Sequence, residues 1–172
     1  MTQYSKRMVI IHWLTLALLI AAWYFGHSLD EARHAASATL AGYVVHAILG
    51  GSIMLLVLLR LYARNKDGVP PAMGDTPMDK LAKGIHYAIY GLLLMLPVSG
   101  MLTVLTSDVR NALITGDATL LPAKFTGVIA HEVHEILVPV LLVLVVVHVL
   151  GALKHQIVLK DGLMERMMLR RK

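Results

Sequence analysis

The chain has 172 residues, of which 57% are hydrophobic, with a formal net charge of +5 and a mean hydropathy of +0.67. Soluble domains are usually about 45–50% apolar, so this composition argues against an ordinary soluble fold. The absence of cysteine excludes disulfides, cysteine-ligated iron–sulfur clusters and a covalently attached c-type haem.

Four hydrophobic blocks are long enough to cross a bilayer, which requires about 20 apolar residues. They are residues 8–26, 40–59, 85–107 and 136–153, the last extending back to His131. The first block follows a basic flank, as a signal peptide does, but it is too long and no small-residue cleavage site follows it. We therefore expect it to be retained. The sequence predicts an all-α protein, a transmembrane four-helix bundle in which residues 1–172 form one domain.

The distribution of basic residues predicts the orientation of the bundle. All 16 except Arg33, Arg110 and Lys124 fall at the N-terminus, in the second-to-third connection or at the C-terminus. By the positive-inside rule these segments are cytoplasmic, so we predict that both termini lie in the cytoplasm. The net positive charge is then a consequence of topology, and we do not interpret it as nucleic-acid binding.

The first predicted helix carries one strongly polar residue, His12, five positions after Arg7. Trp23 near the other end of the block suits the opposite membrane interface. A short polar outer connection is expected at 27–39. Its histidines, at positions 27 and 34, are expected to be solvated.

The second predicted helix carries His46 close to its outer end and is expected to end at Arg60 and Arg64. Gly50 and Gly51 follow His46 by about one turn. The missing side chains there would let a flat ligand or another helix approach.

The connection 65–83 is rich in proline and is predicted to be irregular. The third helix carries His86 near its inner end and Pro97 in its middle, where we expect a kink. Segment 106–130 is a longer outer connection, with room for a short interfacial helix.

The fourth predicted helix contains His134 and, fourteen residues later, His148. Fourteen residues are almost four turns, so the two side chains lie about 40° apart on one face but roughly 21 Å apart along the axis. That separation is too large for one metal. The opening 131–135 is not the zinc protease motif, because Glu135 stands where the motif needs histidine. The helix therefore predicts two centres at two depths.

Two more histidines match these depths. His12 and His148 each lie roughly 8–9 Å from the inner basic boundary, whereas His46 and His134 lie in the first turns from outside. Ionisable residues within membrane helices usually mark functional sites. Paired imidazoles across a bundle suit bis-histidine haem ligation, whereas zinc usually has three or four ligands. We predict that the inner pair, His12 with His148, and the outer pair, His46 with His134, are axial ligands of haem iron.

Other histidines are assigned different roles. His131, at the water boundary one turn before His134, is predicted to be interfacial rather than a ligand. His86 and His155 lie at the inner end, where either could bond a haem propionate or a quinone carbonyl. His155 follows His148 by seven residues, so it returns to nearly the same helix face about 10 Å nearer the cytoplasm.

With these residues placed, the chain resembles the bacterial cytochrome b561 family of small dihaem membrane proteins. The matching stretches are Ile11-His12-Trp13-Leu14, His46, Leu58-Leu59-Arg60-Leu61, His86-Tyr87-Ala88-Ile89-Tyr90, Leu96-Pro97-Val98-Ser99-Gly100, His134-Glu135, His148, His155, Lys160-Asp161 and Met167-Met168. The resemblance covers essentially the whole chain. It implies two haem b groups held by the pairs above, in a bacterial inner membrane. Through superoxide-oxidising members it also implies electron transfer from periplasmic superoxide to ubiquinone, with the quinone reduced near His155.

The outer connections depart from what a superoxide donor would favour. Their basic residues are Arg33, Arg110 and Lys124, and their acidic residues are Asp30, Glu31, Asp108, Asp117, Glu132 and Glu135. A net acidic face repels an anion, so steering of superoxide would need local placement of the basic side chains or charge on His131.

Two other functions fit the same residues. One is a cytochrome b subunit that anchors a hydrogenase or dehydrogenase and receives electrons from a soluble or membrane redox partner. The other is a transition-metal transporter that uses histidines as successive binding sites. Surrounding lipid is expected in each case, and the sequence does not indicate the oligomeric state.

Overall fold

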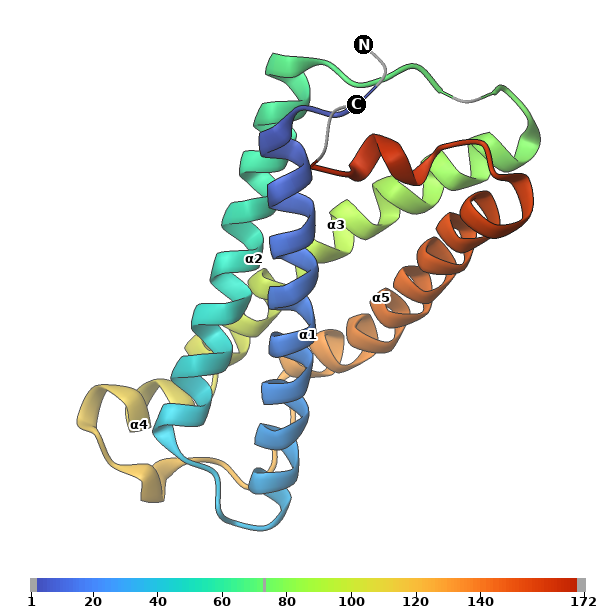
Figure 1. Ribbon diagram of the computed structural model, residues 1–172. Helices are drawn as coiled ribbons and strands as arrows, with labels where there is room; N and C mark the ends of the chain where they lie inside the picture. Colours follow the sequence, from blue (N-terminus) through green and yellow to red (C-terminus); the bar gives the residue numbers. More distant parts are fainter. Residues whose placement is uncertain (1–2, 73, 170–172) are drawn as a thin grey trace.

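The computed structural model describes residues 3–72 and 74–169 (Figure 1). Its four long helices are α1 (Lys6–His34), α2 (Leu40–Asp67), α3 (Pro77–Leu105) and α5 (Ile129–Lys154). Each is long and apolar enough to cross a membrane, and the described residues contain no strand. The prediction of an all-α protein with four membrane-spanning helices is confirmed.

Hydroxyl side chains fix where three of these helices begin. Ser5, Thr39 and Thr76 each accept a hydrogen bond from the backbone N–H three residues later, at the starts of α1, α2 and α3. Thr76 and Asp79 complete a reciprocal capping box. The start of α2 at Leu40 agrees with the predicted position.

The helices extend further than the hydrophobic blocks. The predicted connection 27–39 is shortened to 35–39, because α1 continues to His34, and the connection 65–83 is shortened to 68–76. Hydrophobicity records only the part of a helix that lipid surrounds. The polar turns that follow the apolar block remain helical. In α1 they are supported by the ion pair of Asp30 with Arg33 and by the contact of His27 with Glu31.

The helices pack as two antiparallel pairs, α1 with α2 and α3 with α5, and α2 also contacts α3 (Figure 1). The central cluster of buried apolar side chains consists of Ala22, Ile53, Val57, Leu92, Leu93, Leu96 and Leu141. On α5, Leu141 lies midway between His134 and His148. On α2, Ile53 and Val57 follow His46 towards the inner end. Many other large apolar side chains on these helices are exposed, as expected for a surface that lipid covers.

The two ends of the bundle carry different connections. The described residues nearest both chain ends lie at the same end as the α2–α3 connection, which we call the inner end (Figure 1). The opposite, outer end carries the α1–α2 turn, α4 (Val109–Thr115) and the short η1 (Ala118–Leu120). The short helix predicted within the α3–α5 connection is therefore present.

The C-terminal segment folds back across the inner end. After α5 come the π-helical turn η2 (His155–Leu159) and the 3-10 turn η3 (Met164–Met167). Trp13 Nε1 donates to the Met167 carbonyl at 3.0 Å, and Arg166 Nη1 donates to the Pro71 carbonyl at 2.7 Å. The last residues of the predicted basic tail, 170–172, lie outside the described residues.

Candidate functional site

The outer histidine pair joins α2 to α5. The ring centres of His46 and His134 are 6.1 Å apart, and the ring planes are inclined at 79°. Two imidazoles that bind one first-row metal from opposite sides, at about 2 Å each, have ring centres roughly 6 Å apart. The outer pair therefore has the spacing of two axial ligands.

The inner pair joins α1 to α5 and has the same spacing. The ring centres of His12 and His148 are 6.2 Å apart, with ring planes at 74°. His86 also contacts His148, but those ring centres are only 4.9 Å apart, too close for a metal between the rings. No group of three or more histidine, cysteine or acidic side chains in the described residues could hold a metal ion. Two pairs of histidines thus have the ligand spacing, one at each depth, and His86 lies against the inner pair.

Backbone and hydroxyl groups of α3 set the orientation of His134. Its Nδ1 lies 3.0 Å from the Leu96 carbonyl oxygen and 3.0 Å from Ser99 Oγ. When Nδ1–H donates to the carbonyl, Nε2 is the unprotonated nitrogen and is able to bind a metal. Histidines that bind metals usually make such a second hydrogen bond.

Two glycines make room for the outer rings. A Cβ on Gly26 of α1 would lie 2.8 Å from His46 Cε1, and a Cβ on Gly100 of α3 would lie 3.3 Å from His134 Cε1. Each outer imidazole therefore packs against the backbone of the neighbouring helix.

Gly50 and Gly51, which the sequence singled out, play no such part. A Cβ built on either would meet no heavy atom within 4 Å in the described chain. Of the two explanations offered for them, close approach of another helix of this chain is not found among the described residues. Space for a flat ligand beside α2 remains.

The outer layer also contains unused hydrogen-bonding capacity. Among the described residues, Tyr43 Oη and His46 Nδ1 are buried polar atoms without a partner. Buried polar atoms in folded proteins are nearly always hydrogen-bonded. Tyr43 lies one turn outside His46 on α2. The residues present thus suit a cofactor with polar groups at its edge.

Arg60 is a residue of the inner layer whose role the sequence reasoning missed. Its Nε donates to Tyr90 Oη at 2.7 Å, and its Nη1 donates to the Met8 carbonyl at 2.7 Å. Met8 lies one turn before His12 on α1 and Tyr90 lies one turn after His86 on α3, so the two hydrogen bonds hold the guanidinium within about one turn of the inner histidines. A signal was present in the sequence, because Arg60 follows His46 by fourteen residues, the spacing that separates His134 from His148.

His155 lies at the start of the π-helical turn beyond α5. Its Nδ1 lies 2.5 Å from Asp161 Oδ2. This hydrogen bond holds the pKa of the Asp161 carboxyl below its usual value. Asp161 was not recognised as a partner from the sequence. The contact fixes the ring and leaves Nε2 available to another molecule. His86, the other candidate at this end, has its Nδ1 2.7 Å from the Ala82 carbonyl.

The remaining histidines lie as predicted. His27 and His34 are exposed on the outer turns of α1, beside Glu31 and Asp30. His131 packs against Phe125 with ring centres 4.1 Å apart, and its Nε2 lies 3.0 Å from a Glu135 carboxyl oxygen.

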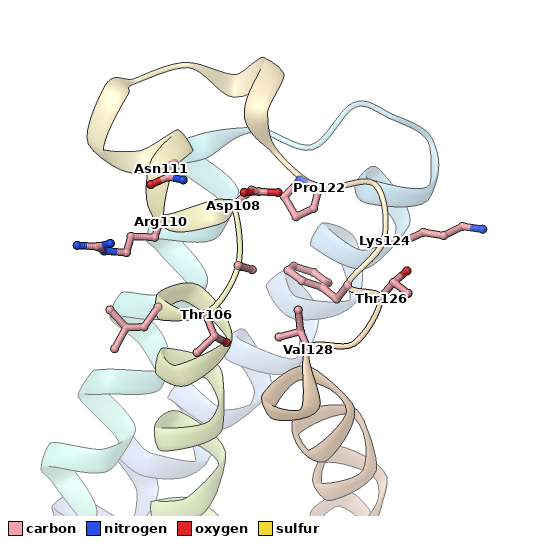
Figure 2. A pocket seen from close by; sticks show the side chains of 11 residues that line it. Thr106, Asp108, Arg110, Asn111, Pro122, Lys124, Thr126 and Val128 are labelled. Atoms are coloured by element: carbon pink, nitrogen blue, oxygen red, sulfur yellow. The ribbon is translucent and has the colours of Figure 1, made fainter.

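The basic side chains of the outer end are placed in two different ways. Arg33 is only 8% exposed, pairs with Asp30 and donates to the Ala123 carbonyl at 2.9 Å. Arg110 and Lys124 instead line a polar cavity of about 430 Å³ between the end of α3, α4 and the segment before α5. Figure 2 shows these two side chains directed outward on opposite sides of the cavity, with Asp108 nearer its centre.

Comparison with known proteins gives matches over nearly the whole chain. A profile of the family described as prokaryotic cytochrome b561 matches residues 3–169. The chain is 32% identical to cytochrome b562 of Cereibacter sphaeroides, over 96% of this chain and 94% of that protein. It is 30% identical to the probable superoxide oxidase CybB of Yersinia pestis, over 96% of both, and 26% identical to cytochrome b561 homolog 1 of Escherichia coli K12, over 100% of both. No solved structure matches it significantly.

Proposed function

Because this chain belongs to the prokaryotic cytochrome b561 family, and so is a membrane haem protein of electron transfer, we propose that it holds two haem b groups and moves electrons between a periplasmic donor and ubiquinone. The observation that carries this proposal is the pair of histidine contacts, with ring centres 6.1 and 6.2 Å apart at two depths.

The four paired histidines are the residues that would hold the cofactors. His46 with His134 would bind the outer haem, and His12 with His148 the inner haem. Haem bound in this way supplies reversible one-electron transfer. Two imidazole ligands per iron would favour electron transfer over the binding of a further ligand at the metal. The apolar cluster between the two layers excludes water from the membrane interior.

The first expected result is therefore two haems per chain. Each histidine pair provides two nitrogen ligands, and no imidazole of one pair can serve the other across the roughly 21 Å axial separation on α5. A pyridine haemochrome titration of purified, fully loaded protein measures the ratio. One haem or fewer per chain would contradict the proposal, and a protein without haem absorption would favour the transporter alternative.

Gly26 provides a more selective test of the outer site. We expect Gly26→Ala to reduce outer haem occupancy, because the added Cβ would lie 2.8 Å from His46 Cε1 and displace the ring. Haem content and the reduced spectrum should show loss of one component while the other is kept. Gly84→Ala, on an exposed part of α3 at the inner end, is the matched control, since its Cβ meets no atom within 4 Å. Equal loss of both components in Gly26→Ala would contradict a local effect.

The orientation that we propose puts the inner end in the cytoplasm. The basic residues gather at that end, as the positive-inside rule requires of the cytoplasmic side. The outer layer then faces the periplasm, and a bacterial inner membrane is the compartment that fits. With this orientation a periplasmic donor would meet the outer end, and we propose the quinone site at the inner end.

Superoxide is the donor that we propose, because one relative is described as a probable superoxide oxidase. Arg110 and Lys124 at the outer cavity give a local positive charge against Asp108, although the outer connections are acidic in total. Arg33 contributes little to this field because Asp30 neutralises it.

Turnover by the isolated chain separates this donor from a protein donor. An oxidase should reduce quinone when supplied with superoxide and no other subunit. An anchor subunit of a hydrogenase or dehydrogenase should be inactive alone and active with a co-purifying partner. Inactivity towards superoxide, with both haems present and reducible by dithionite, would contradict superoxide as the donor.

For the quinone we propose a site at His155. Nδ1–H of His155 donates to the Asp161 carboxylate, so a ring that also carries a proton on Nε2 is the imidazolium, which the Asp161 charge stabilises; that form can donate Nε2–H to a quinone carbonyl at the inner membrane boundary. The ring is also two turns beyond His148 in sequence, on the inner side of that layer. His86 is the other candidate, since its ring contacts His148 directly.

A further inference from the structure

Arg60 is held between three helices within the inner layer. It projects from α2 seven residues before the helix ends at Asp67. Its Nε donates to Tyr90 Oη of α3 and its Nη1 to the Met8 carbonyl of α1. Two fixed hydrogen bonds prevent the guanidinium from extending freely to the surface. Its charge therefore stays beside the imidazoles of the inner pair.

The Arg60 guanidinium forms no ion pair with any carboxylate in the described part of the chain. The nearest acidic residue along its own helix, Asp67, pairs with Arg7 and accepts from Ser5 Oγ at 2.5 Å. The two groups that accept from Arg60 are uncharged, the Tyr90 hydroxyl and the Met8 carbonyl. A cation inside a membrane bundle without a counter-ion is costly, so an anion from outside the chain is expected beside it.

The outer layer differs in this respect. The buried cation near the outer end, Arg33, is neutralised by Asp30 and donates a hydrogen bond to the Ala123 carbonyl. Its Cζ also lies 5.3 Å from the centre of the Phe125 ring. The chain therefore places an uncompensated positive charge at the inner histidine pair and a compensated one near the outer pair. This asymmetry does not depend on the identity of the donor or of the acceptor.

We propose that Arg60 pairs with a propionate carboxylate of the inner haem and thereby makes the midpoint potential of the inner haem higher than that of the outer haem. The inference rests on the proposed function, since it requires a haem at each histidine pair. Reduction adds an electron to the haem, and a nearby positive charge stabilises the added negative charge. The effect is larger in a membrane interior than in water because the local dielectric constant is lower.

The order of potentials gives the direction of electron transfer. With the inner haem easier to reduce, an electron on the outer side moves inward downhill, towards the end of the bundle that carries His155 and Asp161. Arg60 is thus a positioning and tuning residue, and it need not touch the donor or the quinone.

A spectroscopic redox titration of the purified full chain tests the inference without measuring activity. The inner component is identified as the one missing from His148→Ala. In the native chain it should titrate at the higher potential. Arg60→Gln should shift the inner midpoint downward and leave the outer midpoint unchanged, whereas Arg60→Lys should retain most of the native value. Lys80→Gln removes a basic side chain that is 69% exposed at the same end, where water and salt screen it, and should shift neither haem.

Three outcomes would overturn the inference: an outer haem with the higher potential, an Arg60→Gln protein with both midpoints unchanged, or equal shifts of both. A haem count on the same samples separates these from failure of the proposed function, which would appear as fewer than two haems in the native chain. If Arg60→Gln does not assemble, Tyr90→Phe provides the second variant. It removes the acceptor of Arg60 Nε, and it should alter the inner midpoint alone. An unchanged inner midpoint in Tyr90→Phe would then reject the inference.

Discussion

Replacing His46 or His134 with alanine is expected to remove the outer haem and to leave the inner haem in place. Each ring has its partner 6.1 Å away, so loss of either one leaves the iron with a single protein ligand. The inner pair is separated from this layer by the packed cluster that includes Ile53 and Leu141, so its geometry should survive. Haem content should fall by about half, and the reduced-minus-oxidised spectrum should lose one of two components.

His12→Ala and His148→Ala are expected to give the reverse result, with loss of the inner component. His131→Ala is the matched control on α5, because His131 lies one turn from His134 but packs against Phe125 and should not bind iron. If His12→Ala and His46→Ala removed the same spectral component, the pairing of ligands would be wrong. Loss of both components from every variant would indicate a folding defect, which helical content measured by circular dichroism would reveal.

The depths of the histidines could be read from the sequence because they depend on one helix at a time. A rise of 1.5 Å per residue and a known inner boundary place His12, His46, His134 and His148 without any knowledge of how the helices pack. The number of membrane-spanning helices follows for the same reason, from uninterrupted apolar blocks. Both properties are local, and the structure contains four such helices with the four rings in two pairs.

The residues that the sequence reasoning missed act between helices. Gly26 supports a histidine on α2, and Gly100 supports one on α5, so neither glycine lies on the helix of the ring it accommodates. Finding them requires the relative axial register of α1 and α2 and of α3 and α5, which no spacing within one helix provides. Asp161 likewise meets His155 only because the chain reverses after the π-helical turn.

The total charge of the outer connections does not by itself determine the local electrostatic field. Arg33 appears in the sequence as an outer basic residue, yet it is buried and neutralised by Asp30, three positions earlier on the same helix. Arg110 and Lys124 line one cavity although fourteen residues separate them. The field at the outer layer therefore depends on these placements and on their screening by salt more than on the total charge.

The expected effect of His155→Leu is a strong decrease in quinone reduction, with both haems retained and still reduced by the donor. Leucine removes the imidazolium that could donate Nε2–H while keeping a side chain of moderate size, and Asp161 then loses its partner. The measurement has two parts, the rate of haem reduction by the donor and the rate of haem reoxidation by added quinone. Only the second should fall.

The inner end provides two controls that separate binding by His155 from its orientation. Asp161→Asn keeps a hydrogen-bond acceptor for Nδ1 but removes the negative charge, so it should slow quinone reduction less than His155→Leu does. His86→Leu tests the competing site, because His86 contacts His148 and lies at the same end of the bundle. If reoxidation by quinone is unchanged in His155→Leu but slow in His86→Leu, the quinone binds beside the inner histidine pair at His86. If both variants reoxidise at the native rate, neither histidine binds the quinone, and the hydrogen bond between His155 and Asp161 serves only to fold the C-terminal segment against the bundle.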